Sequence, residues 1–287
     1  MAINLGYNHL SGSIPSEIST LSYLEQLTLS VNFFKGTIPD TLGELKTIRN
    51  LELDFNVISG SIPSSLGKLS ALEYLTLWDN QLIGSIPTEI GTMTQLKEFR
   101  LHNNRVTGVI PSEVGSLMQL SVFDAAGNHL KGFIPTELGL TALESLDLGN
   151  CGLTGFIPAE LSKCNKLNTI GLSHNIIFGP IPSEFGTITS LRYLFLSDNR
   201  LTGTFPSQLG NLPNLQVITL QSNYLVGEIP TELGKLASLE NLNLSGNVDL
   251  KGNIPDSLCG LRKNGSLLTF IANCGTCEVP TCCSQCA

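Results

Sequence analysis

The chain has 287 residues, with 24 acidic and 16 basic residues and a formal net charge of −8. Lys and Arg do not cluster, so the sequence lacks the basic surface that nucleic-acid binding requires. No apolar run approaches the roughly 20 residues that cross a bilayer, and the start, Met-Ala-Ile-Asn-Leu, lacks the regions of a signal peptide. We therefore expect neither nucleic-acid binding nor membrane insertion within this chain.

A short motif, Gly-x-Ile/Phe-Pro, recurs along the chain. Its glycines are 24 residues apart, except for one step of 23 residues and one of 25. Such a period predicts a solenoid, in which each repeat covers the apolar face of its neighbour. We expect one elongated domain with eleven repeats over residues 1–261, the first incomplete, followed by a Cys-rich cap over 262–287. The motif glycines are Gly12, Gly36, Gly60, Gly84, Gly108, Gly132, Gly155, Gly179, Gly203, Gly227 and Gly252.

Within each repeat the residue types predict a fixed order of elements. A short L-x-L segment alternates apolar and polar residues, as a half-buried strand does, and successive strands would stack about 4.8 Å apart as a parallel sheet. Gly then permits a tight turn, and Pro removes a donor that the coil does not need. Ser, Thr or Asp follows Pro in ten of the eleven repeats and is suited to start a one-turn helix.

An Asn follows each strand, between two core leucines. A buried polar side chain without partners costs roughly 1–3 kcal/mol. We therefore expect these side chains to hydrogen-bond the backbone of adjacent coils and so to form a ladder. The ladder positions are Asn8, Asn32, Asn56, Asn80, Asn104, Asn128, Asn175, Asn199, Asn223 and Asn247.

The complete pattern is L-x-x-L-x-L-x-x-N-x-L-x-G-x-I-P-x-x-L-G-x-L. The second repeat carries it as Leu24, Leu27, Leu29, Asn32, Gly36, Ile38, Pro39, Leu42, Gly43 and Leu45. It resembles the plant-type leucine-rich repeat, over residues 3 to about 261. The resemblance implies an α/β horseshoe solenoid, with a parallel β-sheet on the concave face and short helical or 3₁₀ turns on the convex side. It also implies kinship with extracellular receptor ectodomains and secreted leucine-rich repeat proteins.

The first repeat is incomplete. Ile3, Leu5 and Asn8 match the end of a strand motif whose first leucine is missing. Solenoids usually need a terminal cap over the open core. We expect a piece of a longer extracellular protein, either secreted or held by a membrane anchor outside this chain.

The polar positions of the strands are not determined by the core, so they carry the information about binding. Repeats three to five bring the only Trp of the chain together with Tyr, Phe, Arg, His and acidic residues. Aromatic residues and Arg dominate binding hot spots, and an exposed Trp beside other aromatic residues marks an interaction surface. The alternative is an ordinary half-polar sheet face. The predicted ligand site comprises Glu52, Asp54, Phe55, Tyr74, Trp78, Asp79, Arg100 and His102.

Catalysis is not predicted. Asp124 and Asp147 would be lateral neighbours, but solvated surface carboxylates explain them, and no nucleophile or cofactor fingerprint accompanies them. A broad open sheet also excludes water poorly. We expect no enzyme, no cofactor and no metal.

Eight cysteines divide into two groups. Cys151 stands at a ladder position and Cys164 at a core leucine position, and both are expected to be buried thiols. The others crowd the C-terminal end, where disulfides compete with zinc binding. Only five residues separate the two C-x-x-C pairs, fewer than in zinc ribbons, which favours disulfides in an oxidising compartment. The pairing is open for Cys259, Cys274, Cys277, Cys282, Cys283 and Cys286.

Two N-x-S sequons, at Asn243 and Asn264, agree with an extracellular or cell-surface location. Asn264 lies in a polar loop and is the better acceptor, because Asn243 falls on the strand face.

The favoured function is recognition of a protein or peptide through the concave face. A secreted inhibitor of a cell-wall-degrading enzyme is the second hypothesis, since similar members of the family have that role. Ice binding is a remote third, because it requires regular ranks of Thr or similar residues. The rank after the motif glycine begins Ser13, Thr37, Ser61 and Ser85 but continues with Val109, Phe133 and Phe156.

Overall fold

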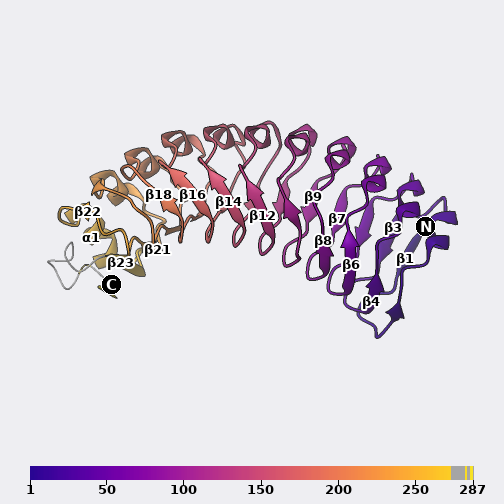
Figure 1. The fold of residues 1–287 in the computed structure, drawn as a ribbon. Helices are drawn as coiled ribbons and strands as arrows, with labels where there is room; N and C mark the ends of the chain where they lie inside the picture. The colour runs from indigo at the N-terminus through magenta and orange to yellow at the C-terminus, as the bar shows by residue number, and fades with distance from the viewer. Residues whose placement is uncertain (273–281, 283–284, 287) are drawn as a thin grey trace. The chain divides into compact units, whose positions relative to one another are not determined.

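The computed structural model describes residues 1–272, 282 and 285–286. The chain forms two compact units, Met1–Gly152 and Leu153–Ala287. Each unit is a stack of similar coils, in which two short strands and then a 3₁₀ helix follow one another along the chain (Figure 1). The boundary falls inside the repeat that is one residue short. The division into repeats over 1–261 and a cap over 262–287 stays a prediction.

The main sheet of the first unit is parallel, and its strands follow one another in chain order. The register pairs Glu52 with Thr28 on one side and with Thr76 on the other, and Thr76 with Arg100. The strands are β1 Ala2–Asn4, β3 Gln26–Thr28, β5 Asn50–Glu52, β7 Tyr74–Thr76, β9 Glu98–Arg100, β11 Val122–Asp124 and β13 Ser145–Asp147.

Shorter strands and 3₁₀ helices complete these coils. The shorter strands are β2 Ser11–Gly12, β4 Phe33–Gly36, β6 Val57–Ser61, β8 Gln81–Ile83, β10 Thr107–Gly108 and β12 His129–Gly132. The 3₁₀ helices are η1 Ser16–Thr20, η2 Asp40–Glu44, η3 Ser64–Lys68, η4 Thr88–Thr92, η5 Ser112–Ser116 and η6 Thr136–Leu140.

The second unit repeats this plan and adds one α-helix. Its main strands are β15 Thr169–Gly171, β17 Tyr193–Phe195, β19 Val217–Thr219, β21 Asn241–Asn243, β23 Thr269–Ala272 and β24 Gln285–Cys286. The shorter strands are β16 Ile176–Gly179, β18 Arg200–Leu201, β20 Gly227–Glu228 and β22 Leu250–Lys251, with β14 Gly152–Gly155 at the boundary. The helices are η7 Ala159–Lys163, η8 Ser183–Thr187, η9 Ser207–Asn211, η10 Thr231–Lys235 and α1 Asp256–Lys263.

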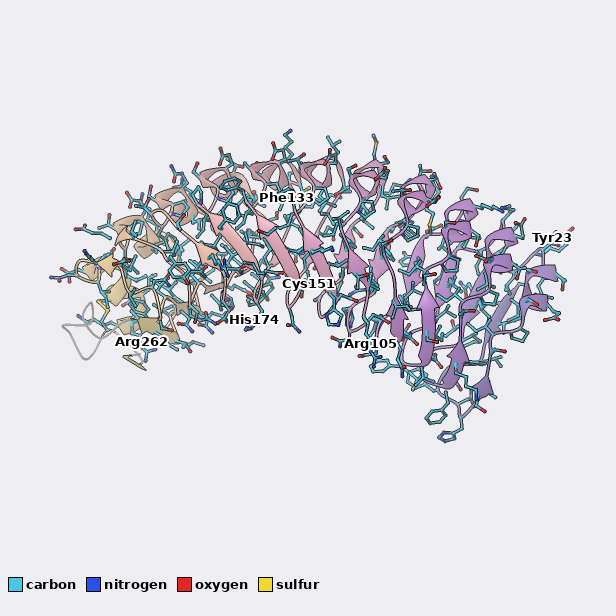
Figure 2. All side chains as sticks on the ribbon, in the orientation of Figure 1. Tyr23, Arg105, Phe133, Cys151, His174 and Arg262 are labelled. Carbon is cyan, nitrogen blue, oxygen red and sulfur yellow. A yellow bond between two sulfur atoms is a disulfide. The ribbon has the colours of Figure 1, made fainter. Side chains whose placement is uncertain are left out.

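The core of each coil lies between its strand and its 3₁₀ helix, and side chains fill this space (Figure 2). The strand leucines, the motif isoleucine and the helix leucine of the second repeat (Leu27, Leu29, Ile38 and Leu42) are each at most 3% exposed. The parallel sheet and the solenoid class predicted from the sequence are therefore confirmed.

The asparagine ladder is also present. Asn56 Nδ2 lies 3.0 to 3.1 Å from the carbonyl oxygens of Leu29, Leu53 and Asp54, and Asn56 Oδ1 accepts the backbone N–H of Phe34 at 2.9 Å. Two of these partners, Leu29 and Phe34, belong to the preceding coil. Each buried Asn thereby links two coils and satisfies four backbone groups.

The prediction that Ser, Thr or Asp starts the short helices is confirmed in ten of the eleven repeats, Ala159 being the exception. In every helix Pro occupies the N-cap position, and no side chain makes the capping hydrogen bond. The proline backbone is held near φ −65°, which leads directly into a helical turn, and the polar residue becomes the first helical residue instead. At this first helical position its side chain lies beyond the N-cap, the position from which a side-chain oxygen accepts hydrogen bonds from the free N–H groups of the first turn.

A positive φ recurs at the residue that precedes each ladder position. Left-handed backbone is costly for residues with a Cβ, and Asn, Asp, His and Gly tolerate it best. Gly127 and Gly246 take it with φ of 63° and 72°. The non-glycine residues in this conformation are Tyr7, Val31, Phe55, Asp79, Asn103, Asn150, His174, Asp198 and Ser222.

Candidate ligand-binding surface

The strand face of the first unit carries a hollow of about 450 Å³, which we call the strand-face hollow. It contains five of the eight predicted site residues, because the register places the polar positions of β3, β5, β7 and β9 side by side. The hollow is lined by Tyr7, Thr28, Ser30, Glu52, Asp54, Thr76, Trp78, Arg100 and His102.

Aromatic rings form one wall of this hollow. The Trp78 ring meets Phe55 edge-on at 4.2 Å between centroids and stacks on His102 at 4.7 Å. Trp78 is half-buried by these neighbours, whereas Phe55 is 43% exposed. The sequence predicted an exposed Trp, and the structure instead shows a Trp ring held in a stack of three. A ring fixed in this way presents an apolar edge at small entropic cost.

The carboxylates in the strand-face hollow are held by hydroxyl groups. Ser30 Oγ donates to Asp54 Oδ1 at 2.9 Å, and Thr76 Oγ1 donates to the same oxygen at 2.5 Å. Thr28 Oγ1 donates to Glu52 Oε2 at 3.1 Å. Asp54 is only 8% exposed, so these hydrogen bonds fix a largely desolvated carboxylate in the floor.

The two bases that line the hollow already have acidic partners. Arg100 Nε lies 2.9 Å from Glu98 Oε2 on the same strand. His102 Nδ1 lies 2.7 Å from Asp124 Oδ2, without the geometry of a hydrogen bond. Neither Glu98 nor Asp124 belongs to the lining of the hollow.

Asp147 extends this row on β13, beside Asp124. Burial raises the pKa of the Asp147 carboxyl, and the neighbouring charge of Asp124 acts in the same direction. The backbone N–H of Gly149, which donates to Asp147 Oδ1 at 3.0 Å, opposes the rise in pKa. The sequence-based expectation of fully solvated carboxylates is therefore inaccurate for Asp147.

Three predicted site residues lie outside the lining: Phe55, Tyr74 and Asp79. Phe55 and Asp79 occupy the left-handed position before the ladder, which turns them away from the alternation of the strand. Tyr74 has the Lys97 ammonium 6.0 Å from its ring centroid. The lining residues that the sequence did not single out are Tyr7, Thr28, Ser30 and Thr76. Comparing every equivalent strand position in adjacent repeats would have found them.

Profiles described as "Leucine rich repeat" match residues 189–248 and, separately, 2–21, 47–69, 71–93, 95–117 and 142–164. A leucine-rich repeat protein of Leptospira interrogans, LIC12759, is 30% identical with a TM-score of 0.65, and the match covers 92% of this chain and 70% of that one. This chain belongs to the leucine-rich repeat family. Comparison with curated protein sequences gives no match.

Two plant structures are also similar to this leucine-rich repeat chain. The plant peptide hormone receptor RGFR1, solved in complex with RGF2, is 34% identical with a TM-score of 0.82; the match covers 94% of this chain and 46% of the receptor chain. A plant ice-binding protein is 28% identical with a TM-score of 0.71, and the match covers 87% of this chain and 82% of that one. The chain thus spans about half the length of the receptor.

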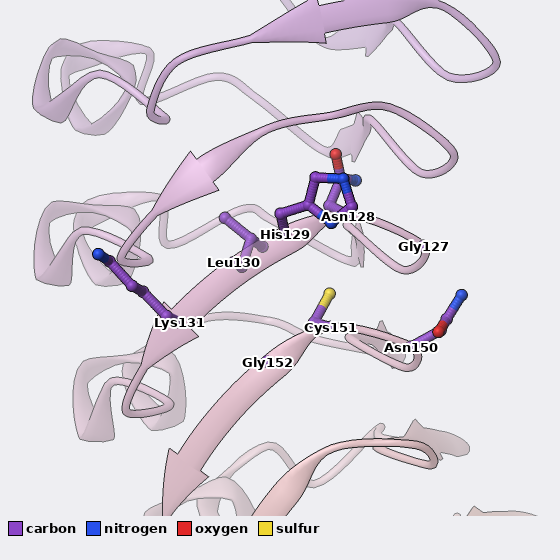
Figure 3. A pocket seen from close by; sticks show the side chains of 8 residues that line it. All are labelled: Gly127, Asn128, His129, Leu130, Lys131, Asn150, Cys151 and Gly152. Carbon is purple, nitrogen blue, oxygen red and sulfur yellow. The ribbon is translucent and has the colours of Figure 1, made fainter.

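A second hollow, of about 380 Å³, lies where the leucine-rich repeat ladder is interrupted (Figure 3). Here Cys151 replaces Asn, and its Sγ lies 3.5 Å from the carbonyl oxygens of Ala125 and Gly149. Burial raises the pKa of the Cys151 thiol, which favours its neutral form. Cys151 is half-buried rather than buried, whereas Cys164 is 3% exposed, as expected for a core position.

Of the six C-terminal cysteines, Cys259 on α1 and Cys282 form a disulfide. This pair agrees with the predicted disulfide cap. Cys274, Cys277 and Cys283 lie outside the described residues, as does the side chain of Cys286.

The two sequons differ in their surroundings. Asn264 is exposed at the C-terminal end of α1, while Asn243 lies within β21 and its Oδ1 accepts hydrogen bonds from Ser245. This geometry favours Asn264 as an acceptor.

The eight-residue α1 is too short to span a bilayer, and the same is true of every other helix in the described part of the chain.

Proposed function

We propose that this chain is a non-catalytic extracellular recognition module that binds a protein or peptide across the strand face of its first unit. The observation that carries the proposal is the strand-face hollow, with its fixed aromatic wall and hydrogen-bonded carboxylates. Such a concave surface with a few fixed polar groups is typical of ligand sites. The similarity to RGFR1, solved with RGF2, supports a peptide, and the Cys259–Cys282 disulfide supports an extracellular location.

The test is capture of ligands from extracellular material, with the intact chain compared with Trp78→Ala. Removing a ring packed between Phe55 and His102 should weaken binding by about 2 kcal/mol if it is a hot spot. Ser173→Ala, two residues after the end of β15 in the second unit, is the control and should bind like the parent. Equal binding of the two variants would refute the choice of surface. Inhibition of a cell-wall-degrading enzyme is assayed on the same material, and inhibition that requires Trp78 would identify that enzyme as the partner.

Ice binding is the second candidate. Besides the similarity to a plant ice-binding protein, the exposed Ser13, Thr37, Ser61 and Ser85 form a rank on consecutive coils of the first unit. The rank is short, because the next coils place Val109 and Phe133 there, which are 54% and 67% exposed. Ice recrystallisation assays with Thr37→Tyr decide between the candidates: ice activity lost in this variant, with ligand capture unchanged, would favour ice binding.

A further inference from the structure

The strand-face hollow contains a buried negative charge that has no cation. Asp54 is 8% exposed, and its two hydrogen-bond donors, Ser30 and Thr76, both reach Oδ1. Its second oxygen, Oδ2, accepts no hydrogen bond within the described part of the chain and is open to solvent, and no Lys, Arg or His lies within ion-pair distance there. Buried carboxylates are normally paired, because an uncompensated charge in a desolvated position is costly. Asp54 therefore lacks a partner that a ligand can supply.

The other charged residues of the lining do not neutralise the negative charge of the hollow. Glu52, the second carboxylate of the lining, has only the Thr28 hydroxyl. Arg100 and His102 do not compensate it, since each contacts a carboxylate outside the lining, Glu98 and Asp124 respectively. The hollow thus has two carboxylates without cationic partners, and each of its two bases lies beside a carboxylate outside the lining.

The walls of the hollow suit an organic cation. Trp78 forms one wall, and Tyr7, which is 83% exposed, belongs to the same lining. Trp78 is packed between Phe55 and His102, so it offers an apolar edge to the stem of a basic side chain. The exposed Tyr7 ring offers an aromatic face, which attracts ammonium and guanidinium groups. A metal ion fits less well, because Ca²⁺ takes about six to eight oxygen ligands. In the described part of the chain no three His, Cys, Asp or Glu side chains converge as a metal site.

We infer that the strand-face hollow binds a basic side chain of the ligand, Arg or Lys, with its cation over Asp54 and Glu52 and its stem against Trp78. This inference rests on the proposed function and specifies its ligand: a peptide or protein segment with an exposed basic residue. A volume of about 450 Å³ accommodates one long side chain and part of the adjoining backbone.

The single Trp of the chain allows a direct test. The intact chain is titrated with the acetylated, amidated tripeptide Gly-Arg-Gly, and with its uncharged analogue in which citrulline replaces Arg. Because Trp78 lines the hollow, its fluorescence reports occupancy. We expect saturable binding of the Arg tripeptide with a Kd of about 10 mM or below, and at least about tenfold weaker binding of the citrulline tripeptide. Added salt should weaken only the former.

Matched variants localise the effect. Asp54→Asn keeps the acceptor for Ser30 and Thr76, and should weaken binding of the Arg tripeptide about tenfold; Glu52→Gln should have a smaller effect in the same direction. Asp198→Asn removes the same charge in the second unit, at a left-handed position that Asn tolerates, and should leave the Kd within about twofold. Unfolding curves confirm that each variant is folded.

Several results would overturn the inference: equal affinity for the two tripeptides, no saturable change with the Arg tripeptide, unchanged affinity in Asp54→Asn, or saturation by CaCl₂ alone. The two proposals fail separately. A captured ligand that depends on Trp78 but not on Asp54 would refute the basic-residue inference and leave the recognition function intact. Capture that is independent of Trp78 would refute the proposed site, whatever the tripeptides show.

Discussion

The residue before each ladder position has a left-handed backbone, and Val31 is the least suited to it. Val31 has φ of 57°, where a β-branched side chain crowds the backbone at a cost of roughly 1–2 kcal/mol. Asn tolerates this conformation and occupies the same position as Asn103 and Asn150. We expect Val31→Asn to raise the free energy of unfolding by about 1 kcal/mol.

Urea unfolding of the two variants would check this expectation. The reciprocal change, Asn150→Val, should lower the free energy of unfolding by a similar amount. A loss of stability in Val31→Asn would show that the contacts of the half-buried Val side chain outweigh its backbone strain.

The raised pKa of Asp147 makes a prediction about pH. A carboxyl group whose pKa is higher in the folded than in the unfolded chain stabilises the fold below its unfolded pKa. This contribution is lost as the pH rises through the folded pKa. Asp147→Asn removes the charge but keeps an acceptor for Gly149 N–H. The variant should be more stable than the parent at neutral pH, and the difference should shrink below a pH of about 4. Denaturant unfolding at both pH values measures it, and a pH-independent difference would contradict the assignment.

The ladder shows what one side chain does for two coils. Removing the Asn56 side chain leaves the buried N–H of Phe34 without its acceptor and takes one hydrogen bond from each of three carbonyl groups. Those carbonyl groups keep a second donor each, from Asn32, Asn80 and the Val31 N–H. Asn56→Ala should lower the free energy of unfolding by about 3 kcal/mol. Asn8 has the same place in the pattern but is exposed, so Asn8→Ala should cost far less. Comparable losses in the two variants would mean that the ladder stabilises the fold little.

The interruption at Cys151 gives the converse prediction. The thiol reaches two carbonyl oxygens only at 3.5 Å, longer than the corresponding distances of 3.0 to 3.1 Å around Asn56. An amide would supply stronger donors and an acceptor. We expect Cys151→Asn to raise the free energy of unfolding by about 1 kcal/mol, measured by thermal denaturation. A lower melting temperature would show that the shortened repeat has no room for the amide.

In a solenoid each coil contacts its neighbours, so a local change affects stability locally. The Cys259–Cys282 disulfide closes a stretch with a sequence separation of 23 residues at the end of the second unit. Cys259→Ser should cost about 3 kcal/mol there. Hydrogen exchange should become faster in β21 and β23, whereas β5 and β7 of the first unit should be unaffected. Uniformly faster exchange in both units would contradict local stability.

Periodicity alone was sufficient to predict the strands, the buried leucines and the ladder. The reason is physical: one repeat cannot bury its own apolar face, so 24-residue spacing permits little besides stacked coils. The same pattern correctly located the carboxylates, Trp78 and Arg100 on one face, because side chains alternate along a strand. The position before each ladder residue is often Asp, Asn, His or Gly, which tolerate left-handed backbone. Ligand-binding surfaces contain the same residue types, so composition alone did not distinguish the two explanations.

Tertiary structure decided which of these side chains contact one another. The partners of Trp78, Phe55 and His102, are 23 and 24 residues away in sequence, and their ring stacking depends on the stagger of neighbouring coils. Likewise, Arg100 pairs with Glu98 rather than with the acids of the hollow, and only this pairing leaves Asp54 without a cation. Periodicity determines which face a residue occupies, since the backbone repeat sets that. Rotamers and lateral distances determine partners and charge balance, and these are set by neighbours that a single repeat does not contain.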